Sequence, residues 1–191
     1  MTALDLTIID ATPDHEEAIR TLWDRVIQDA FKRQGMDEHH NPADELDFKM
    51  DQLTEAWHHP SQRYFLAYEN AKLIGTMAYG KPPNRGIRRR TGGALNNTVE
   101  IGSLYIHPDY QRQGIGKTLL IHALKTLHSE GVDTVCFDSI IESSKTIWLK
   151  LFGEPRYKIP SKKHDFTHMI WVVDTKTALK RLMDKENNKN A

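Results

Sequence analysis

The hydrophobic and polar positions of this 191-residue chain repeat with two different periods along the sequence. Alternation of apolar and polar residues is typical of half-buried strands, whereas apolar spacing of three and four residues is typical of amphipathic helices. The alternating stretches predict six strands, at residues 4–9, 63–68, 72–79, 98–106, 134–137 and 164–173. The helical spacing predicts helices from Pro13 to near Gly35, at 43–57, behind Gly116, at 143–152 and at 175–183.

Two segments follow neither period. Residues 81–97 hold five basic residues and no acidic residue, together with prolines and glycines that are typical of a loop. We therefore expect a mobile loop between the third and fourth strands. Residues 185–191 are polar and charged, and we expect them to be disordered.

Composition narrows the class of protein. A hydrophobic content of 39% with 27% charged residues is typical of a soluble globular chain, and the length suits one domain. No apolar run approaches the roughly 20 residues of a membrane span, and the first residues lack a secretory leader pattern. The single cysteine, Cys136, cannot form an internal disulfide, which favours a cytoplasmic location. A net charge of zero gives no general attraction to nucleic acid or to a membrane.

A glycine-rich turn stands between the strand at 98–106 and the helix behind it. The turn reads Gln111-Arg112-Gln113-Gly114-Ile115-Gly116, and apolar residues then recur with helical spacing, at Leu120, Ala123, Leu124 and Leu127. Such a helix start presents unpaired backbone N–H groups and the positive end of the helix dipole, so it suits an anion such as a phosphate. A P-loop would need a glycine at Gln111, and a dinucleotide fingerprint would need one at Leu119.

The spacing Gln111-x-x-Gly114-x-Gly116, preceded by a strand that ends at His107-Pro108, resembles the acetyl-CoA loop of the GNAT acetyltransferase superfamily. The motif of that loop is Gln/Arg-x-x-Gly-x-Gly/Ala. The resemblance implies an α/β fold of the α+β type. Its central sheet would be mixed, with about six or seven strands, splayed at the cofactor strand and flanked by helices. It implies a catalytic domain at residues 1–174, followed by a C-terminal helix and tail at 175–191.

The same resemblance assigns the cofactor-binding residues. They would contact acetyl-CoA, the donor substrate, through the cofactor strand, the glycine-rich turn and a later helix: Leu104, Tyr105, Ile106, Gln111, Arg112, Gln113, Gly114, Ile115, Gly116, Lys117, Thr118, Ser143 and Ser144. Only glycine allows a backbone to approach a ligand closely, which would explain Gly114 and Gly116. The Leu104 N–H would polarise the thioester carbonyl.

Acetyl transfer to an amine also needs a base, because a lysine-like amine has a pKa of about 10.4. Glu100 is the candidate, since it interrupts an apolar strand that it shares with Gly102, Leu104 and Ile106, and its spacing to Gln111 resembles that of family members with a glutamate base. Burial among apolar neighbours would raise its pKa toward neutrality. The alternative is a glutamate at a sheet edge that pairs with a cationic side chain.

The general acid is less clear from the sequence. Trp148 occupies the position of the tyrosine that many family members use to protonate the leaving thiolate, and an indole cannot donate that proton. Tyr157 is the catalytic candidate in its place, with Tyr105 or solvent as alternatives. Trp148 itself suits core packing.

Other polar residues favour simpler interpretations. Cys136 suits a core position, and the adjacent pairs His39-His40 and His58-His59 do not predict a metal site. The run Arg88-Arg89-Arg90 suits a solvated loop, the 3′-phosphate of coenzyme A, an acidic substrate or nucleic acid. The segment 37–55 has seven acidic residues and one lysine, which suits a solvated helix face or attraction of a cationic amine.

The sequence therefore predicts a cytoplasmic N-acetyltransferase that acts on a primary amine of a small molecule or peptide, with no metal and with no nucleic acid or membrane as partner. Alternatives are a non-catalytic acyl-CoA-binding or sensing module, and a GNAT protein that uses a longer acyl donor or a protein acceptor. The oligomeric state stays open, a homodimer included.

Overall fold

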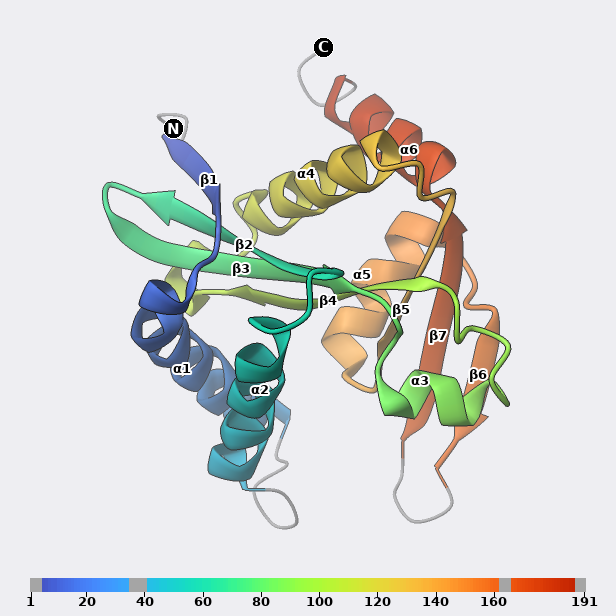
Figure 1. Ribbon diagram of the computed structural model, residues 1–191, viewed down its shortest axis with the longest axis horizontal. Helices are drawn as coiled ribbons and strands as arrows, with labels where there is room; N and C mark the ends of the chain where they lie inside the picture. The colour runs from blue at the N-terminus through green and yellow to red at the C-terminus, as the bar shows by residue number, and fades with distance from the viewer. Residues whose placement is uncertain (1–4, 35–40, 162–165, 188–191) are drawn as a thin grey trace. The chain divides into compact units, whose positions relative to one another are not determined.

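A computed structural model describes residues 5–34, 41–161 and 166–187. Its strands are β1 (Leu6–Asp10), β2 (Gln62–Glu69), β3 (Lys72–Gly80), β4 (Val99–Ile106), β5 (Thr134–Ser139), β6 (Tyr157–Pro160) and β7 (Thr167–Asp174). Its α-helices are α1 (Glu16–Gln34), α2 (Pro42–Ala56), α3 (Arg85–Arg90), α4 (Ile115–Ser129), α5 (Glu142–Phe152) and α6 (Thr175–Asn187) (Figure 1). The strands form one mixed sheet in the order β1-β2-β3-β4-β5-β7-β6, which confirms the predicted fold class.

The described chain divides into two compact units. The first contains the residues up to Ala78 and Ser103–Leu120, and the second contains Tyr79–Gly102 and the residues from Ile121 onward. Three elements, β3, β4 and α4, pass from one unit into the other.

In the first unit, α1 and α2 lie side by side and bury their apolar stripes against β2 and β3 (Figure 1). The stripe of α1 includes Leu22 and Trp23, and that of α2 includes Met50 and Leu53, all at most 3% exposed. These residues have the spacing expected of amphipathic helices. The amphipathic helices predicted from this spacing are thereby confirmed.

Thr76 links three elements of this unit through its buried hydroxyl. Its Oγ1 accepts a hydrogen bond of 2.9 Å from Trp23 Nε1 and donates one of 2.9 Å to the backbone carbonyl of Ser103. Ser103 has a left-handed φ of 49°, which is unusual inside a strand and interrupts the regular alternation of β4. The side chain of β3 therefore stabilises an irregularity in β4 that the sequence pattern does not show.

In the second unit, β5 pairs antiparallel with β7, and β7 pairs antiparallel with β6. One face of these strands carries Cys136 and Ile170, which pack with Ile87 of α3. The opposite face carries Phe137 and Trp171, whose stacked rings lie 5.7 Å apart. Because neighbouring residues of a strand point to opposite faces, the two layers follow directly from the sequence of β5.

Three elements differ from the sequence-based expectation. The helix α6 continues to Asn187, so residues 185–187, which were expected to be disordered, extend the helix predicted at 175–183. The expected loop at 81–97 contains α3, a helix that Asn84 caps by accepting a 3.0 Å hydrogen bond from the Ile87 N–H. The short strand β6 follows a break at Gly153, and the pattern of four residues was too short to identify it. Within the described residues, no helix is both long and apolar enough to cross a membrane.

We expect Thr76→Val to lower the free energy of unfolding by roughly 2–3 kcal/mol, because it removes two hydrogen bonds and leaves a buried indole N–H and a carbonyl unsatisfied. Urea unfolding followed by tryptophan fluorescence measures the change. Thr76→Ser keeps the hydroxyl and serves as the matched control. Equal stability of the valine and serine variants would contradict the role of the hydroxyl.

Candidate functional site

The glycine-rich turn lies in the first unit and ends at the start of α4. Arg112 and Gly114 have left-handed φ values of 65° and 92°. The Thr118 N–H donates to the Gly114 carbonyl at 3.0 Å, so the amides of Ile115 and Gly116 lie ahead of the first helical hydrogen bond. Amides at this position have no intrahelical acceptor and form an anion-binding helix start.

Two glutamine side chains hold this turn in place. Gln111 Nε2 donates to the Ile106 carbonyl at 3.0 Å, and Gln111 Oε1 accepts from Arg33 Nη1 at 3.2 Å. Gln113 Nε2 donates to the Asp109 carbonyl at 3.0 Å. Both side chains therefore tie the turn to neighbouring chain segments.

The two glycines of the motif differ in what the fold requires. Gly114 has a left-handed φ, which disfavours any residue with a Cβ. A Cβ on Gly116 would lie 3.7 Å from Ile106 Cγ1 and 3.8 Å from Leu104 Cδ1, which is ordinary van der Waals contact. The fold alone thus accounts for Gly114 but does not require glycine at position 116.

The strand β4 has the irregular geometry that a splayed cofactor strand needs. Its ladder with β5 joins Val99 to Val135 and Glu100 to Cys136, whereas β5 continues to pair with β7 as far as Ser139. The left-handed Ser103 then interrupts the shared face that strict alternation gave to Glu100, Gly102, Leu104 and Ile106. That expectation was too simple beyond Gly102.

Tyr105 points into the core of the first unit. Its ring lies 5.4 Å from the ring of Trp23, and burial raises the pKa of its phenol, with a smaller opposing effect from Lys49. A phenol packed in this way is poorly placed to exchange a proton with a ligand. Of the two tyrosines considered as general acid, Tyr105 is therefore the less suitable.

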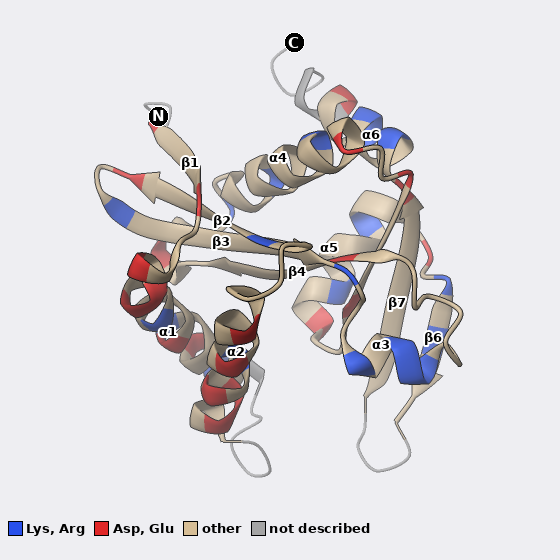
Figure 2. Cartoon of the chain, in the orientation of Figure 1, with Lys and Arg blue, Asp and Glu red and all other residues tan. Residues whose placement is uncertain are grey.

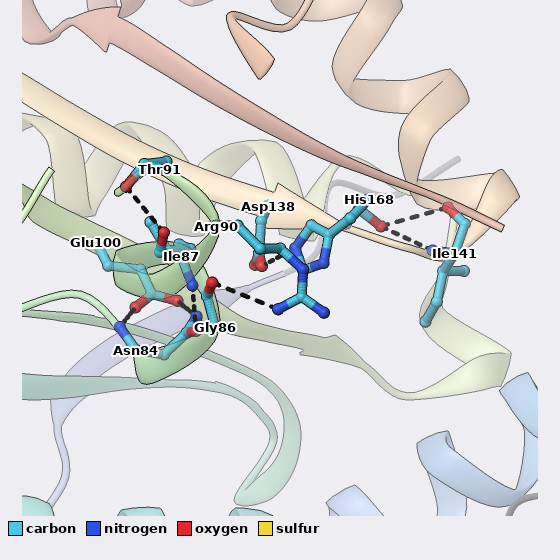
Figure 3. Close-up of polar contacts among 10 residues, drawn as sticks. Asn84, Gly86, Ile87, Arg90, Thr91, Glu100, Asp138, Ile141 and His168 are labelled. Carbon is cyan, nitrogen blue, oxygen red and sulfur yellow. Dashed lines mark hydrogen bonds and ion pairs between the residues drawn. The ribbon is translucent and has the colours of Figure 1, made fainter. Parts of the chain in front are cut away.

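Glu100 lies in the second unit, where both its carboxylate oxygens bind one residue. Oε2 accepts a hydrogen bond of 2.5 Å from the Asn84 backbone N–H, and Oε1 accepts one of 2.6 Å from Asn84 Nδ2 (Figure 3). Asn84 is also the residue that caps α3. The sequence suggested either an apolar environment or a cationic partner, and it did not reveal this amide. Two N–H donors favour the ionised carboxylate.

An acid–base pair of Asp138 and His168, which sequence reasoning missed, lies on the face of the sheet that α3 covers. His168 Nε2 and Asp138 Oδ2 are hydrogen-bonded, and His168 Nδ1 is buried with no hydrogen-bond partner in the described residues (Figure 3). The available signal was the alternation of His168 with Ile170 and Val172, which places the histidine at an inward position.

Cys136 lies between the two carboxylates of this face. Burial raises the pKa of its thiol to about 12, and the negative charges of Glu100 and Asp138 contribute to the increase. Because a thiolate is the nucleophilic form, this thiol is a core residue and not an acyl carrier. The structure therefore supports the expected role of Cys136.

The start of α5 carries the two serines assigned to the cofactor. Ser143 is exposed and Ser144 is half-buried. The neighbouring Lys145 is 2% exposed, and its ammonium binds Glu142 Oε1 at 2.5 Å. Trp148 packs against Phe137, with ring centroids 4.8 Å apart, which agrees with the core-packing interpretation.

The remaining candidate residues lie in separate places. Tyr157 is on β6 and packs with the cluster that contains Ile87 and Ile170. The acids of α2 lie mainly on its solvent-exposed side (Figure 2). His58 and His59 line a surface hollow of the first unit together with Trp57 and Arg63. The pair His39-His40 lies outside the described residues.

Comparison with known proteins agrees with this architecture. The profile of the family described as "Acetyltransferase (GNAT) family" matches residues 27–142. The uncharacterised N-acetyltransferase ycf52 of Gracilaria tenuistipitata var. liui is 29% identical over 79 residues, which is 40% of this chain and 43% of that protein. The match thus spans less than half of the relative.

Solved structures share the fold at low identity. A GNAT-family acetyltransferase structure from Desulfovibrio desulfuricans aligns with a TM-score of 0.67 and 13% identity, over 89% of this chain and 99% of the other. The PaiA N-acetyltransferase of Thermoplasma acidophilum, solved with coenzyme A, aligns with a TM-score of 0.63 and 15% identity, over 88% and 99%. The profile match covers more than half of the chain, and the chain belongs to the GNAT acetyltransferase family, whose members use acyl-CoA.

Proposed function

We propose that this protein transfers an acetyl group from acetyl-CoA to a primary amine of a small molecule or peptide. The observation that carries the proposal is the start of α4. There the left-handed φ of Gly114 shapes the turn, and the amides of Ile115 and Gly116 lie ahead of the first helical hydrogen bond, where they can bind a phosphate.

In this proposal the backbone amides of the turn bind the pyrophosphate of acetyl-CoA, while Arg112 and Lys117 add positive charge. The backbone of Leu104, Tyr105 and Ile106 contacts the pantetheine arm. The Leu104 N–H donates to the thioester carbonyl and stabilises negative charge on that oxygen during attack. Ser143 and Ser144 supply hydroxyl groups to the cofactor.

The reaction is a direct transfer. The amine nitrogen attacks the thioester carbon, the carbon–sulfur bond breaks, and the sulfur leaves with the bonding electron pair. Glu100 accepts the proton of the amine, through a water molecule, and the two donors of Asn84 keep the carboxylate ionised and ready to accept it. Tyr157 is the proposed donor of a proton to the thiolate, since Trp148 has no hydroxyl.

A second candidate function is acyl-CoA binding without transfer. Two observations favour it: Trp148 packs with Phe137 at the position of the missing tyrosine, and Asn84 already binds both oxygens of Glu100. A longer acyl donor and a protein acceptor are further alternatives, and turnover with acetyl-, propionyl- and succinyl-CoA distinguishes the donors. A cytoplasmic location is part of the proposal.

We expect Gly114→Val to weaken acetyl-CoA binding at least tenfold, or about 1.4 kcal/mol, because a branched side chain disfavours the left-handed φ of 92° that shapes the turn. The fold should stay largely intact, at a cost of about 1–2 kcal/mol, since a Cβ there would meet no atom within 4 Å. Calorimetric titration with acetyl-CoA, with ATP and NAD as ligand controls, measures the affinity.

Gly116→Ala is the matched control for Gly114→Val. It should keep its stability and its affinity, because a Cβ there would make only ordinary van der Waals contact with Ile106 and Leu104. If Gly114→Val binds acetyl-CoA as tightly as the wild type does, the assignment of the turn as the pyrophosphate site is wrong.

For Glu100→Gln we expect turnover to fall by roughly 10²- to 10⁴-fold, the usual contribution of a general base, with unchanged affinity for acetyl-CoA. Thiol release in an amine screen gives the rate, and calorimetry gives the affinity. Retained turnover in this variant would exclude Glu100 as the base. A wild-type protein that binds acetyl-CoA but acetylates no amine would favour the binding module.

Asn84→Asp tests how the carboxylate is kept ionised. Aspartate caps a helix as well as asparagine does, but here it replaces an N–H donor of Glu100 by a second negative charge. The pKa of Glu100 should rise, so the acidic limb of the kcat/KM profile should move to higher pH. Asn84→Ala removes both the side-chain cap of α3 and the side-chain N–H donor of Glu100. An unshifted limb in Asn84→Asp would contradict the contact with Asn84.

A further inference from the structure

The helix α3 concentrates positive charge. Four of its six residues are arginines, Arg85, Arg88, Arg89 and Arg90, and the segment 81–97 around them contains no acidic residue (Figure 2). Arg88 and Arg90 are half-buried, whereas Arg85 and Arg89 are exposed. Like charges this close together repel one another, so an anion that binds them relieves an existing cost.

The arginines of α3 have no carboxylate within ion-pair distance among the described residues. Arg90 Nη1 reaches the Gly86 carbonyl, at 3.4 Å, and Arg88 Nε is buried with no hydrogen-bond partner among the described residues. The guanidinium groups of Arg85 and Arg89, on exposed residues, complete the positive charge of this helix.

The side chains of Asn84 and Arg90 both border Gly86. A Cβ at Gly86 would lie 2.9 Å from Asn84 Oδ1 and 3.1 Å from Arg90 Nη1. Asn84 in turn binds both oxygens of Glu100 (Figure 3). The cationic helix is thus attached to the carboxylate that the proposed function uses as its base.

We propose that α3 binds an anionic group of the acceptor, so that the acetylated amine belongs to a molecule that also carries a carboxylate or a phosphate. The inference rests on the proposed function, because Glu100 marks the place of the amine. Guanidinium groups suit both anions, since their planar N–H donors match carboxylate and phosphate oxygens.

Other anions explain the arrangement less well. The pyrophosphate of acetyl-CoA is assigned to the turn before α4, whereas α3 is fastened to Glu100 by Asn84. If α3 bound the 3′-phosphate instead, variants of its arginines would raise the KM for acetyl-CoA. A nucleic-acid surface would need basic residues well beyond one helix of six residues, and the whole chain has a net charge of zero. The acceptor is the partner that both Glu100 and α3 would contact.

The test compares amines that differ only in the anionic group, with acetyl-CoA at saturation. β-Alanine is paired with β-alaninamide, and phosphoethanolamine with ethanolamine, so that one pair reports a carboxylate and the other a phosphate. We expect the wild type to prefer the anionic member of at least one pair by about tenfold or more in kcat/KM, as a charged hydrogen bond allows.

Arg88→Ala/Arg90→Ala should lose this preference through a higher KM for the anionic amine, while Arg181→Ala on α6 keeps it. Arg90→Lys retains the charge without the planar fork and should lose part of the preference. The inference is wrong if the wild type shows no preference, if the double variant keeps it, or if the double variant raises the KM for acetyl-CoA instead.

A measurement without turnover separates this inference from the proposed function. Inorganic phosphate is titrated calorimetrically into the wild type and into Arg88→Ala/Arg90→Ala. Binding that the double variant loses supports the anion site even if no amine is acetylated, in which case only the proposed function fails. Equal phosphate binding by both proteins overturns the site on α3.

Discussion

The hydroxyl of Thr76 is the contact on which the geometry of β4 depends. Ser103 has a left-handed backbone, and its carbonyl turns to a side-chain donor on β3. The same hydroxyl accepts from Trp23 of α1, so the helix layer, β3 and the irregular strand are fixed together by one buried group. A buried polar group with both its bonds satisfied specifies one arrangement, because every alternative leaves a donor or an acceptor unpaired.

The carboxylate of Glu100 connects local folding to chemistry in the second unit. Through Asn84 it fixes the start of α3, a helix too short to be stable by its own hydrogen bonds. The same two donors favour the ionised state that a base requires. A structural role and a proton-accepting role therefore do not exclude each other, since both depend on the carboxylate and its pair of amide donors.

The sequence predicted those features whose signals are local. The turn at Gln111–Gly116 and the stripes of α1 and α2 follow from spacing within a few residues, and the structure contains all of them. By contrast, α3 depends on the hydrogen bonds between Asn84 and Glu100, which are 16 positions apart in the sequence. The hydrogen bond between Asp138 and His168 joins residues 30 positions apart. Such partners are set by strand register and packing, which periodicity does not encode. The roles of the site residues remain predictions.

Asn84 contacts both the carboxylate of Glu100 and the first turn of α3, so the two can be thermodynamically coupled. Its side chain and N–H bind Glu100, and its Oδ1 caps α3 through the Ile87 amide. A ligand that displaces Asn84 from the carboxylate releases the residue that also caps the helix. Where that release weakens the cap, stabilising the helix weakens the binding of that ligand by the same factor. The chain thus couples the occupancy of one carboxylate to the order of an arginine-rich segment, and it does so without any contact between the ligand and that helix.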